Sequence, residues 1–326
     1  MILTEPIRTC LGLDIAKAKL DACLLVGTRA LHAQFDHSQP GLRRLRAWCK
    51  KHGQPTPLTV LEATGRYSEL AAAELHAAGH RVHLANPRRI KDHARSLGRR
   101  NKTDRIDAEL IAGFGTARAL SDWQPASPEQ EHLRALLRRL ADLGSLLQAE
   151  RNRTEAAADA IVAKSLARTR RALEKESALI EAQITAHIRA TPALRADVAR
   201  LCAMEGIGER TAWWICAETP RHLPNGRAAA AWLAVTPARA PERHQRLRHT
   251  APAGTEGNRH LRRVLFMSAM VARRFNPRLK AFADRLAAAG KSKMSVLFAV
   301  LHKLFKISFT LLKNQSAYLP THSAKN

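Results

Sequence analysis

Two aspartates three residues apart are the first residues whose type and spacing could support chemistry. Asp104 and Asp107 stand among helically spaced apolar residues, and Thr103 is a suitable N-cap before them. Both carboxylates then project from one helical face, close enough to share a cation. Like charges that close repel each other unless something positive lies between them. The alternative is an acidic helix start that the helix dipole stabilises.

Two further acids end apolar segments that resemble strands. Asp14 lies near the end of the run 9–16, and Glu62 near the end of the run 58–63. An unpaired charge in a buried strand is costly, and neighbouring strands bring their ends to one edge of a sheet. We therefore expect both acids to meet Asp104 and Asp107 in a site for Mg²⁺ or Mn²⁺. Such ions commonly act in pairs in phosphoryl transfer. The alternative is that the acids cap elements or pair with arginines.

The elements that must position these acids follow a recognisable order. Three strands in succession predict an antiparallel meander, and helices then alternate with two more strands. This is the ribonuclease-H-like order of an α/β layered sheet, and we assign it to a domain spanning residues 1–122. The expected strands are 9–16, 20–26, 30–35, 58–63 and 81–85, and the expected helices are 41–52, 68–78 and 88–97.

The remainder of the chain is predicted to be helical. Residues 129–195 contain almost no Gly or Pro and favour one or two long helices, either a coiled-coil hairpin that serves assembly or a plain helical spacer. Residues 196–316 form a second compact domain, and 317–326 are expected to be a disordered tail. Within that domain, Gly206 and Gly208 lie in a helix-hairpin-helix signature that could bring backbone N–H groups to a phosphate. An ordinary turn between core helices is the alternative.

The overall charge points to a polyanionic partner. Lys plus Arg minus Asp plus Glu gives 54 − 28 = +26, and nucleic acid is the default partner of such a chain. A membrane surface is the competing polyanion, but no apolar run is expected to approach the ~20 residues of a spanning helix. Residues 1–10 lack the apolar core of a signal peptide. Five cysteines without metal-ligand spacing indicate reduced core thiols. A cytoplasmic protein is therefore expected.

Three sequence blocks resemble a known family. Residues 12–17, 61–67 and 100–108 are similar to the three acidic blocks of the DEDD transposases of the IS110 insertion-sequence family, relatives of the Piv and MooV DNA invertases. The resemblance implies a RuvC-like domain in which Asp14, Glu62, Asp104 and Asp107 hold Mg²⁺ or Mn²⁺. It also implies a coiled coil that joins subunits into a dimer or tetramer with composite sites. The implied partners are double-stranded DNA and a structured guide RNA, in a prokaryotic, nucleoid-associated protein.

The resemblance further implies a serine nucleophile that this chain lacks. Residues 230–237 and 257–263 are similar to the family's blocks on either side of that serine, and the matching position falls near Glu242. No serine occurs between Ser177 and Ser268. Thr250 and Thr255 are the hydroxyls in the intervening loop that could substitute.

The same loop is rich in Arg and His, which suits phosphate contact. Arg239, Arg243 and Arg262 are the candidate phosphate clamps. Three functions therefore remain open: an RNA-guided recombinase, a catalytically inactive or repurposed nucleic-acid-binding relative, and a metal-dependent RuvC-like nuclease that uses water.

Overall fold

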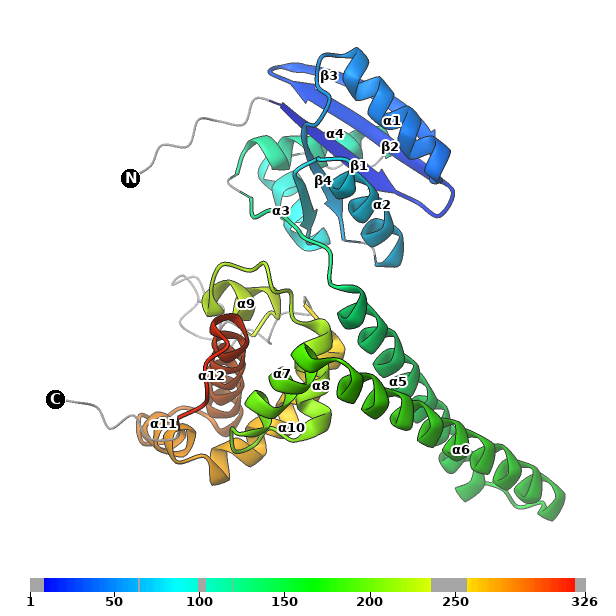
Figure 1. The fold of residues 1–326 in the computed structure, drawn as a ribbon, viewed down its shortest axis with the longest axis vertical. Coiled ribbons are helices and arrows are strands. Elements are labelled where there is room, and N and C mark those ends of the chain that lie inside the picture. The colour runs from blue at the N-terminus through cyan, green and yellow to red at the C-terminus, as the bar shows by residue number, and fades with distance from the viewer. Residues whose placement is uncertain (1–8, 64, 99–103, 119, 236–256, 320–326) are drawn as a thin grey trace. The chain divides into compact units, whose positions relative to one another are not determined.

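The computed structural model describes residues 9–63, 65–98, 104–118, 120–235 and 257–319. The chain divides into two compact units, Met1–Pro125 and Ala126–Asn326. The first unit is a mixed α/β layer structure and the second is helical, as Figure 1 shows. This confirms the predicted combination of an α/β region with an all-α region.

The first unit is built on a five-stranded sheet in the order β3-β2-β1-β4-β5. Its first three strands pair antiparallel, and β4 and β5 continue parallel to β1. The predicted meander followed by alternating helices and strands is confirmed. The strands are β1 (Thr9–Ile15), β2 (Lys19–Val26), β3 (Arg29–Asp36), β4 (Leu58–Glu62) and β5 (Val82–Ala85).

Helices cover both faces of this sheet. Because side chains alternate along a strand, β1 sends Leu11 and Leu13 into one core and Cys10 into the other. Helices α1 (Gln39–Lys51) and α2 (Arg66–Ala77) cover the leucine face. Helices α3 (Pro87–Ser96) and α4 (Asp104–Thr116) cover the Cys10 face. The result is a three-layer arrangement, visible in Figure 1.

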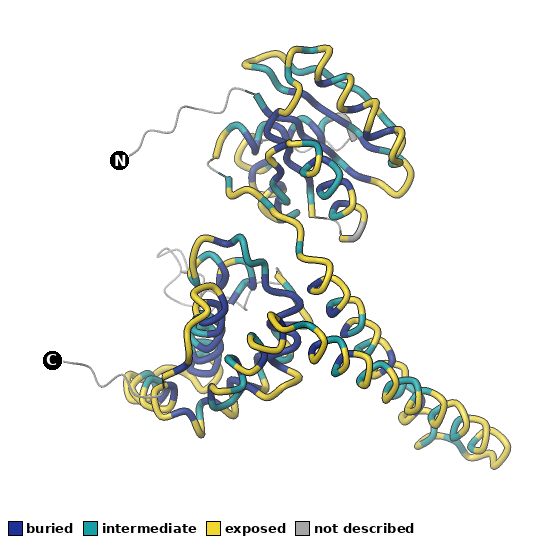
Figure 2. The backbone as a smooth tube through the Cα atoms, viewed as in Figure 1, coloured by how far each residue is buried: buried dark blue, intermediate teal, exposed yellow. Residues whose placement is uncertain are grey.

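A hairpin of two long helices opens the second unit. Helices α5 (Pro128–Glu155) and α6 (Ala160–Ala190) pack side by side (Figure 1). Leu133 and Ile184 join the main core at one end of the hairpin, whereas Ile161 near the other end is 80% exposed. In Figure 2 the far tip of the hairpin has the colour of exposed residues. The predicted long helices are present, and their role in assembly stays a prediction.

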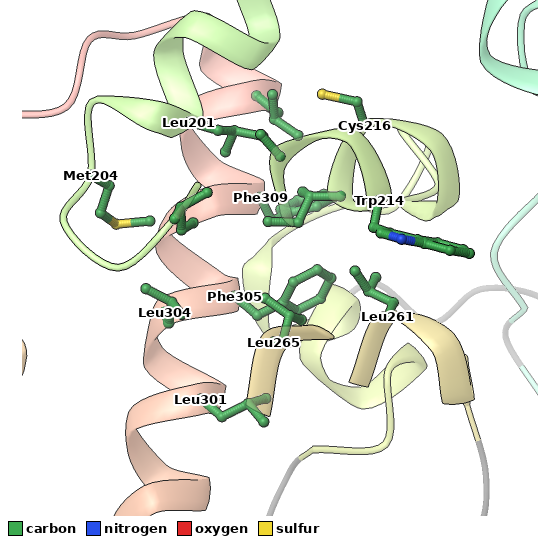
Figure 3. Close-up of a cluster of buried hydrophobic side chains, with 14 of the residues drawn as sticks. Leu201, Met204, Trp214, Cys216, Leu261, Leu265, Leu301, Leu304, Phe305 and Phe309 are labelled. Atoms are coloured by element: carbon green, nitrogen blue, oxygen red, sulfur yellow. The ribbon is translucent and has the colours of Figure 1, made fainter. Parts of the chain in front are cut away.

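Helices α7, α9, α10 and α11 of this unit pack against α12, and α8 packs against α7 and α10. Figure 3 shows Phe305 of α12 lying beside Leu265 of α10, and both belong to one hydrophobic cluster with Leu261 and Leu304. The helices are α7 (Pro192–Cys202), α8 (Glu209–Glu218), α9 (Gly226–Trp232), α10 (Arg259–Phe275), α11 (Pro277–Ala288) and α12 (Lys293–Asn314).

Helix α12 is the one helix of the described chain that is long and apolar enough to cross a membrane, with a mean hydropathy of 1.6. The expectation that no apolar segment approaches that length therefore does not hold for α12. However, 56% of the apolar segment is buried inside the protein, as expected for a core helix.

All five cysteines are free thiols, and four of them are buried. Burial raises the pKa of Cys49 and of Cys216 to about 12, so both remain protonated and unreactive at neutral pH. The predicted core location holds for these four thiols, whereas Cys202 is half-buried.

The folded unit extends slightly beyond the expected start of the tail at residue 317. Tyr318 is buried, and Asn276 Nδ2 donates to its hydroxyl at 2.7 Å. A buried phenol with a hydrogen-bond partner is part of the core. Residues 320–326 lie outside the described residues.

Candidate active site

The sheet brings two of the predicted acids next to each other. Strands β1 and β4 are parallel neighbours whose register pairs Leu13 with Leu61. Asp14 and Glu62 each follow directly in their own strand, so they occupy adjacent positions at one edge of the sheet. Both are half-buried. The sequence-based expectation that their strands are neighbours is therefore confirmed.

Gly12 lets helix α4 lie directly on β1. A Cβ built on Gly12 would lie 2.9 Å from the Ala112 Cα and closer still to the Ala108 carbonyl and the Ala112 amide. The helix backbone therefore occupies the space that any side chain at Gly12 would need. One turn further on, a Cβ on Gly115 would lie 2.9 Å from Val60 Cγ2. Two glycines, one in the strand and one in the helix, thus allow close packing of these elements.

This packing directs the amino-terminal turn of α4 toward the acidic edge. The helix crosses β1 antiparallel, with Gly115 near Cys10 and Ala108 over Gly12. Asp14 is two residues beyond Gly12 and therefore lies on the same face of the sheet. Asp107 directly precedes Ala108, so the backbone brings it toward the edge that carries Asp14.

A shared cation site remains a prediction at this edge. The side chain of Asp104, the first residue of α4, is outside the part of the chain that the structure describes. Among the described side chains, no three Asp, Glu, His or Cys form a group that could hold a metal. The backbone therefore supports convergence of Asp14, Glu62 and the start of α4, but the four-carboxylate set is not seen as a cluster.

Sequence reasoning missed a further acid at the same edge. Asp21 on β2 is the direct cross-strand partner of Asp14. Like charges in that position repel each other. Lys19 Nζ lies 3.1 Å from the Asp21 carboxylate and offsets its charge, and Gln34 Nε2 donates a hydrogen bond to it at 2.7 Å. The short turn between the first two predicted strands was the signal, because a tight hairpin places residues symmetrically about its turn.

The predicted phosphate-binding glycines differ in their surroundings. Gly206 has a φ of +101°, and a Cβ there would lie 2.5 Å from the Ala272 Cβ on α10. Glycine is therefore required at position 206, both for the left-handed turn and for packing inside the unit. Gly208 precedes α8 as its N-cap, with no side-chain cap and open space at its Cα. Of the two, Gly208 has the accessible backbone that a phosphate contact needs.

The two segments that flank the expected nucleophile loop lie close together. Gly257, with a φ of +89°, packs so closely that a Cβ would lie 2.5 Å from the Leu233 carbonyl oxygen. Residues 236–256 between these points lie outside the described residues. Arg239, Arg243, Glu242, Thr250 and Thr255 are among them. Arg262 lies in the first turn of α10, where burial lowers the pKa of its guanidinium.

Ser268, the first serine after the gap, does not replace the missing nucleophile. Its side chain is buried, and its hydroxyl is hydrogen-bonded to the Thr211 hydroxyl at 2.8 Å. This contact joins α10 to α8, so Ser268 serves packing.

A second group that the sequence did not reveal is buried around Glu218, at the end of α8. Arg138 Nε of helix α5 donates to Glu218 Oε1 at 3.1 Å, and Arg134 Nε lies 3.6 Å from Oε2. Asn258, which caps the amino terminus of α10, donates from Nδ2 to Oε2 at 2.8 Å. One buried carboxylate thus joins the helical hairpin to the segment that follows residue 256. Each partner is 40 to 84 residues away from Glu218 in the sequence (258 − 218 = 40 and 218 − 134 = 84), so no local pattern indicates these contacts.

We expect Gly257→Ala to destabilise the second unit by about 1–3 kcal/mol, because the left-handed backbone is strained for alanine and the new Cβ meets a carbonyl. The free energy of unfolding in urea measures this. Gly144→Ala, in α5 with open space around it, is the control and should be neutral or stabilising. Equal effects of the two changes would contradict the close contact.

Comparison with known proteins identifies the class. Residues 11–163 match a model of the DEDD transposases of IS110 type, and residues 198–284 match the transposase family IS116/IS110/IS902. The pilin gene-inverting protein of Moraxella bovis is 30% identical over 321 residues, which cover 95% of this chain and 98% of that protein. Its counterpart in Moraxella lacunata has the same identity and coverage. An IS110 protein of Streptomyces coelicolor is 28% identical over 160 residues, 48% of this chain and 38% of that protein.

An α/β unit with acids on adjoining strand ends, followed by a helical unit that matches a second transposase model, defines a protein of the transposase class. The matches cover both units. The chain belongs to the IS116/IS110/IS902 family of transposases.

Proposed function

We propose that this protein is a site-specific DNA recombinase that acts in the cytoplasm, associated with the nucleoid. Its RuvC-like unit binds divalent metal through Asp14, Glu62, Asp104 and Asp107. The observation that carries the proposal is the register of β1 with β4, combined with the close approach of α4 over Gly12. Together they support the proposed convergence of acids from two strands and one helix at one edge of the sheet. The strand order and directions agree with the ribonuclease-H-like arrangement that the proposal requires.

The residues present suit a hard cation. Carboxylate oxygens are the ligands that Mg²⁺ and Mn²⁺ prefer, and the proposed set supplies four of them. A divalent ion held there would polarise a scissile phosphate and stabilise charge on its oxygens. The chain's own contribution is to hold the carboxylates: the sheet register places Asp14 beside Glu62, and Gly12 allows α4 to approach.

The proposed partners are double-stranded DNA and a structured guide RNA, bound by a dimer or tetramer. The net charge of +26 supports binding of a polyanion. We propose that helices α7 and α8 and the turn between them form a helix-hairpin-helix. The backbone amide at Gly208 would approach the nucleic-acid phosphates, and Gly206 allows the left-handed conformation of the turn. Arg239, Arg243 and Arg262 are the proposed phosphate contacts. The α5–α6 hairpin is the proposed coiled coil for subunit assembly.

A second candidate function follows from one sequence observation. The chain has no serine between Ser177 and Ser268, and Ser268 itself is buried. A recombinase that forms a covalent protein–DNA intermediate needs a side-chain nucleophile to conserve the energy of the cleaved bond. Without one, the acids could support hydrolysis by water or no cleavage at all. A metal-dependent nuclease and a non-cleaving binding protein are therefore the alternatives.

Removal of one predicted metal ligand tests the proposal. Asp107→Asn should lower Mg²⁺-dependent strand cleavage of supercoiled DNA carrying the element ends by at least ~10²-fold, since metal stabilisation of the transition state is worth several kcal/mol. It should also weaken Mn²⁺ binding measured by calorimetry. Asp92→Asn is the matched control, because Asp92 is exposed on α3 and pairs with Arg95.

Trapping of a protein–DNA adduct separates the candidates. An adduct that disappears in a Thr250→Ala, Thr255→Ala double variant supports a recombinase with a threonine nucleophile. Cleavage that depends on Asp107 without an adduct supports the nuclease. Salt-sensitive binding of DNA or RNA, without an adduct and without cleavage, supports the non-cleaving binding protein. Full cleavage and full Mn²⁺ binding by Asp107→Asn would contradict the proposed acidic site.

A further inference from the structure

Two cations lie against one aromatic ring on the α11–α12 hairpin, and two more act electrostatically on one of them. Lys303 Nζ of α12 lies 4.2 Å from the centre of the Phe282 ring, and Arg285 Cζ of α11 lies 5.6 Å from it. Arg278 and Lys306 are close enough to act electrostatically on Lys303. We call these five residues the Phe282 cluster.

Helical spacing explains why the cluster has one common face. Arg278, Phe282 and Arg285 follow at i, i+4 and i+7 on α11, which places them on one side of that helix. Lys303 and Lys306 are three residues apart on α12, and the two helices pack against each other. The cations therefore come from two rigid helices that hold their spacing.

The positive charge of the cluster has no acidic counterpart in the described parts of the chain. None of the ion pairs found there includes Arg278, Arg285, Lys303 or Lys306. The acid of α11, Asp284, is two residues from Phe282 and therefore projects from another side of the helix.

The surroundings of Lys303 show that this arrangement is unfavourable by itself. Partial burial and the three neighbouring cations lower the pKa of the Lys303 ammonium. The ring face attracts cations, but it carries two here, and their mutual repulsion opposes that attraction. An anion with several charges spread over the surface would remove the repulsion among all four cations.

We propose that the Phe282 cluster is a docking surface for the backbone phosphates of a nucleic acid. Successive phosphates offer regularly spaced negative charges, which match cations distributed over two helices better than a single small anion does. Such contacts fix position without reading base sequence. The inference rests on the proposed function only in that the protein acts on nucleic acid. It adds a surface distinct from the α7–α8 turn and from Arg262.

The test compares two double variants of the full-length protein with the same loss of charge. Arg285→Gln with Lys303→Gln removes two cations of the cluster. Lys280→Gln with Lys291→Gln removes two exposed cations from α11 and the turn after it, outside the cluster. Binding to duplex DNA and to a structured RNA is measured between about 50 and 200 mM salt. Thermal unfolding of each variant checks the fold.

For the cluster variant we expect the slope of log K against log salt to become shallower by about 1–2 on DNA, RNA or both, because each lost phosphate contact removes about 0.7–0.9. The Lys280, Lys291 variant should keep a slope near that of the wild type. Loss on DNA alone assigns the surface to DNA, and loss on RNA alone assigns it to RNA. The double variant Arg285→Lys with Lys303→Arg preserves both positive charges, so its slope of log K against log salt should stay close to that of the wild type.

Equal slopes for the two glutamine variants on both nucleic acids would overturn the inference while leaving the proposed function intact. Salt-insensitive or absent binding by the wild type would instead refute the proposed function, and the cluster's role with it.

Discussion

Alanine in place of Gly12 is expected to destabilise the first unit by about 3 kcal/mol or more, because the new methyl group overlaps the backbone of α4. Neither partner can move cheaply: β1 is hydrogen-bonded to strands on both sides, and α4 is packed over three strands. A helix that is pushed away also carries Asp107 away from Asp14. Unfolding in urea should show a lower midpoint, and Mn²⁺ binding should weaken.

Gly113→Ala is the matched control in the same helix. A Cβ on Gly113 would meet only His93 Nε2, at an ordinary 3.8 Å. Alanine is the better helix former, so this change should be neutral or stabilise by about 0.5–1 kcal/mol. If Gly12→Ala were as stable as Gly113→Ala, α4 would not lie on β1 as described.

Removal of the Glu218 side chain should have the second large effect. Glu218 is 4% exposed, and it accepts from Arg138 and Asn258 while lying beside Arg134. Glu218→Ala leaves the mostly buried Arg134 without its counter-charge, a change that typically costs 3–5 kcal/mol. Arg138 is about half exposed and can be hydrated, which favours the lower end of that range.

The free energy of unfolding of the full chain measures this second effect. Glu174→Ala removes an exposed carboxylate that pairs with Arg170 along α6, and it should cost less than about 0.5 kcal/mol. Glu218→Gln keeps an acceptor oxygen for Asn258 and should fall between the two. A Glu218→Ala protein with wild-type stability would show that the carboxylate does not join α5 to the start of α10.

Much of the fold was accessible from local patterns. Strand and helix positions in the first unit agree with the predicted order, because alternating apolar residues and capping residues act over a few positions. The long helices of the middle segment follow from the scarcity of Gly and Pro. The expected division into residues 129–195 and 196–316 stays a prediction, and the structure shows that Leu133 and Ile184 belong to the core of the second unit.

The sequence by itself determined the acidic residue types at the strand ends, the large positive charge and the lack of a serine between Ser177 and Ser268. Tertiary structure decided which residues meet. The pairing of Asp14 with Asp21 depends on strand register, and the need for glycine at position 12 depends on a helix nearly a hundred residues later in the chain. Glu218 and the Phe282 cluster acquire their environments in the same way. Such contacts arise from long-range packing, and a pattern that repeats every two or four residues carries no record of them.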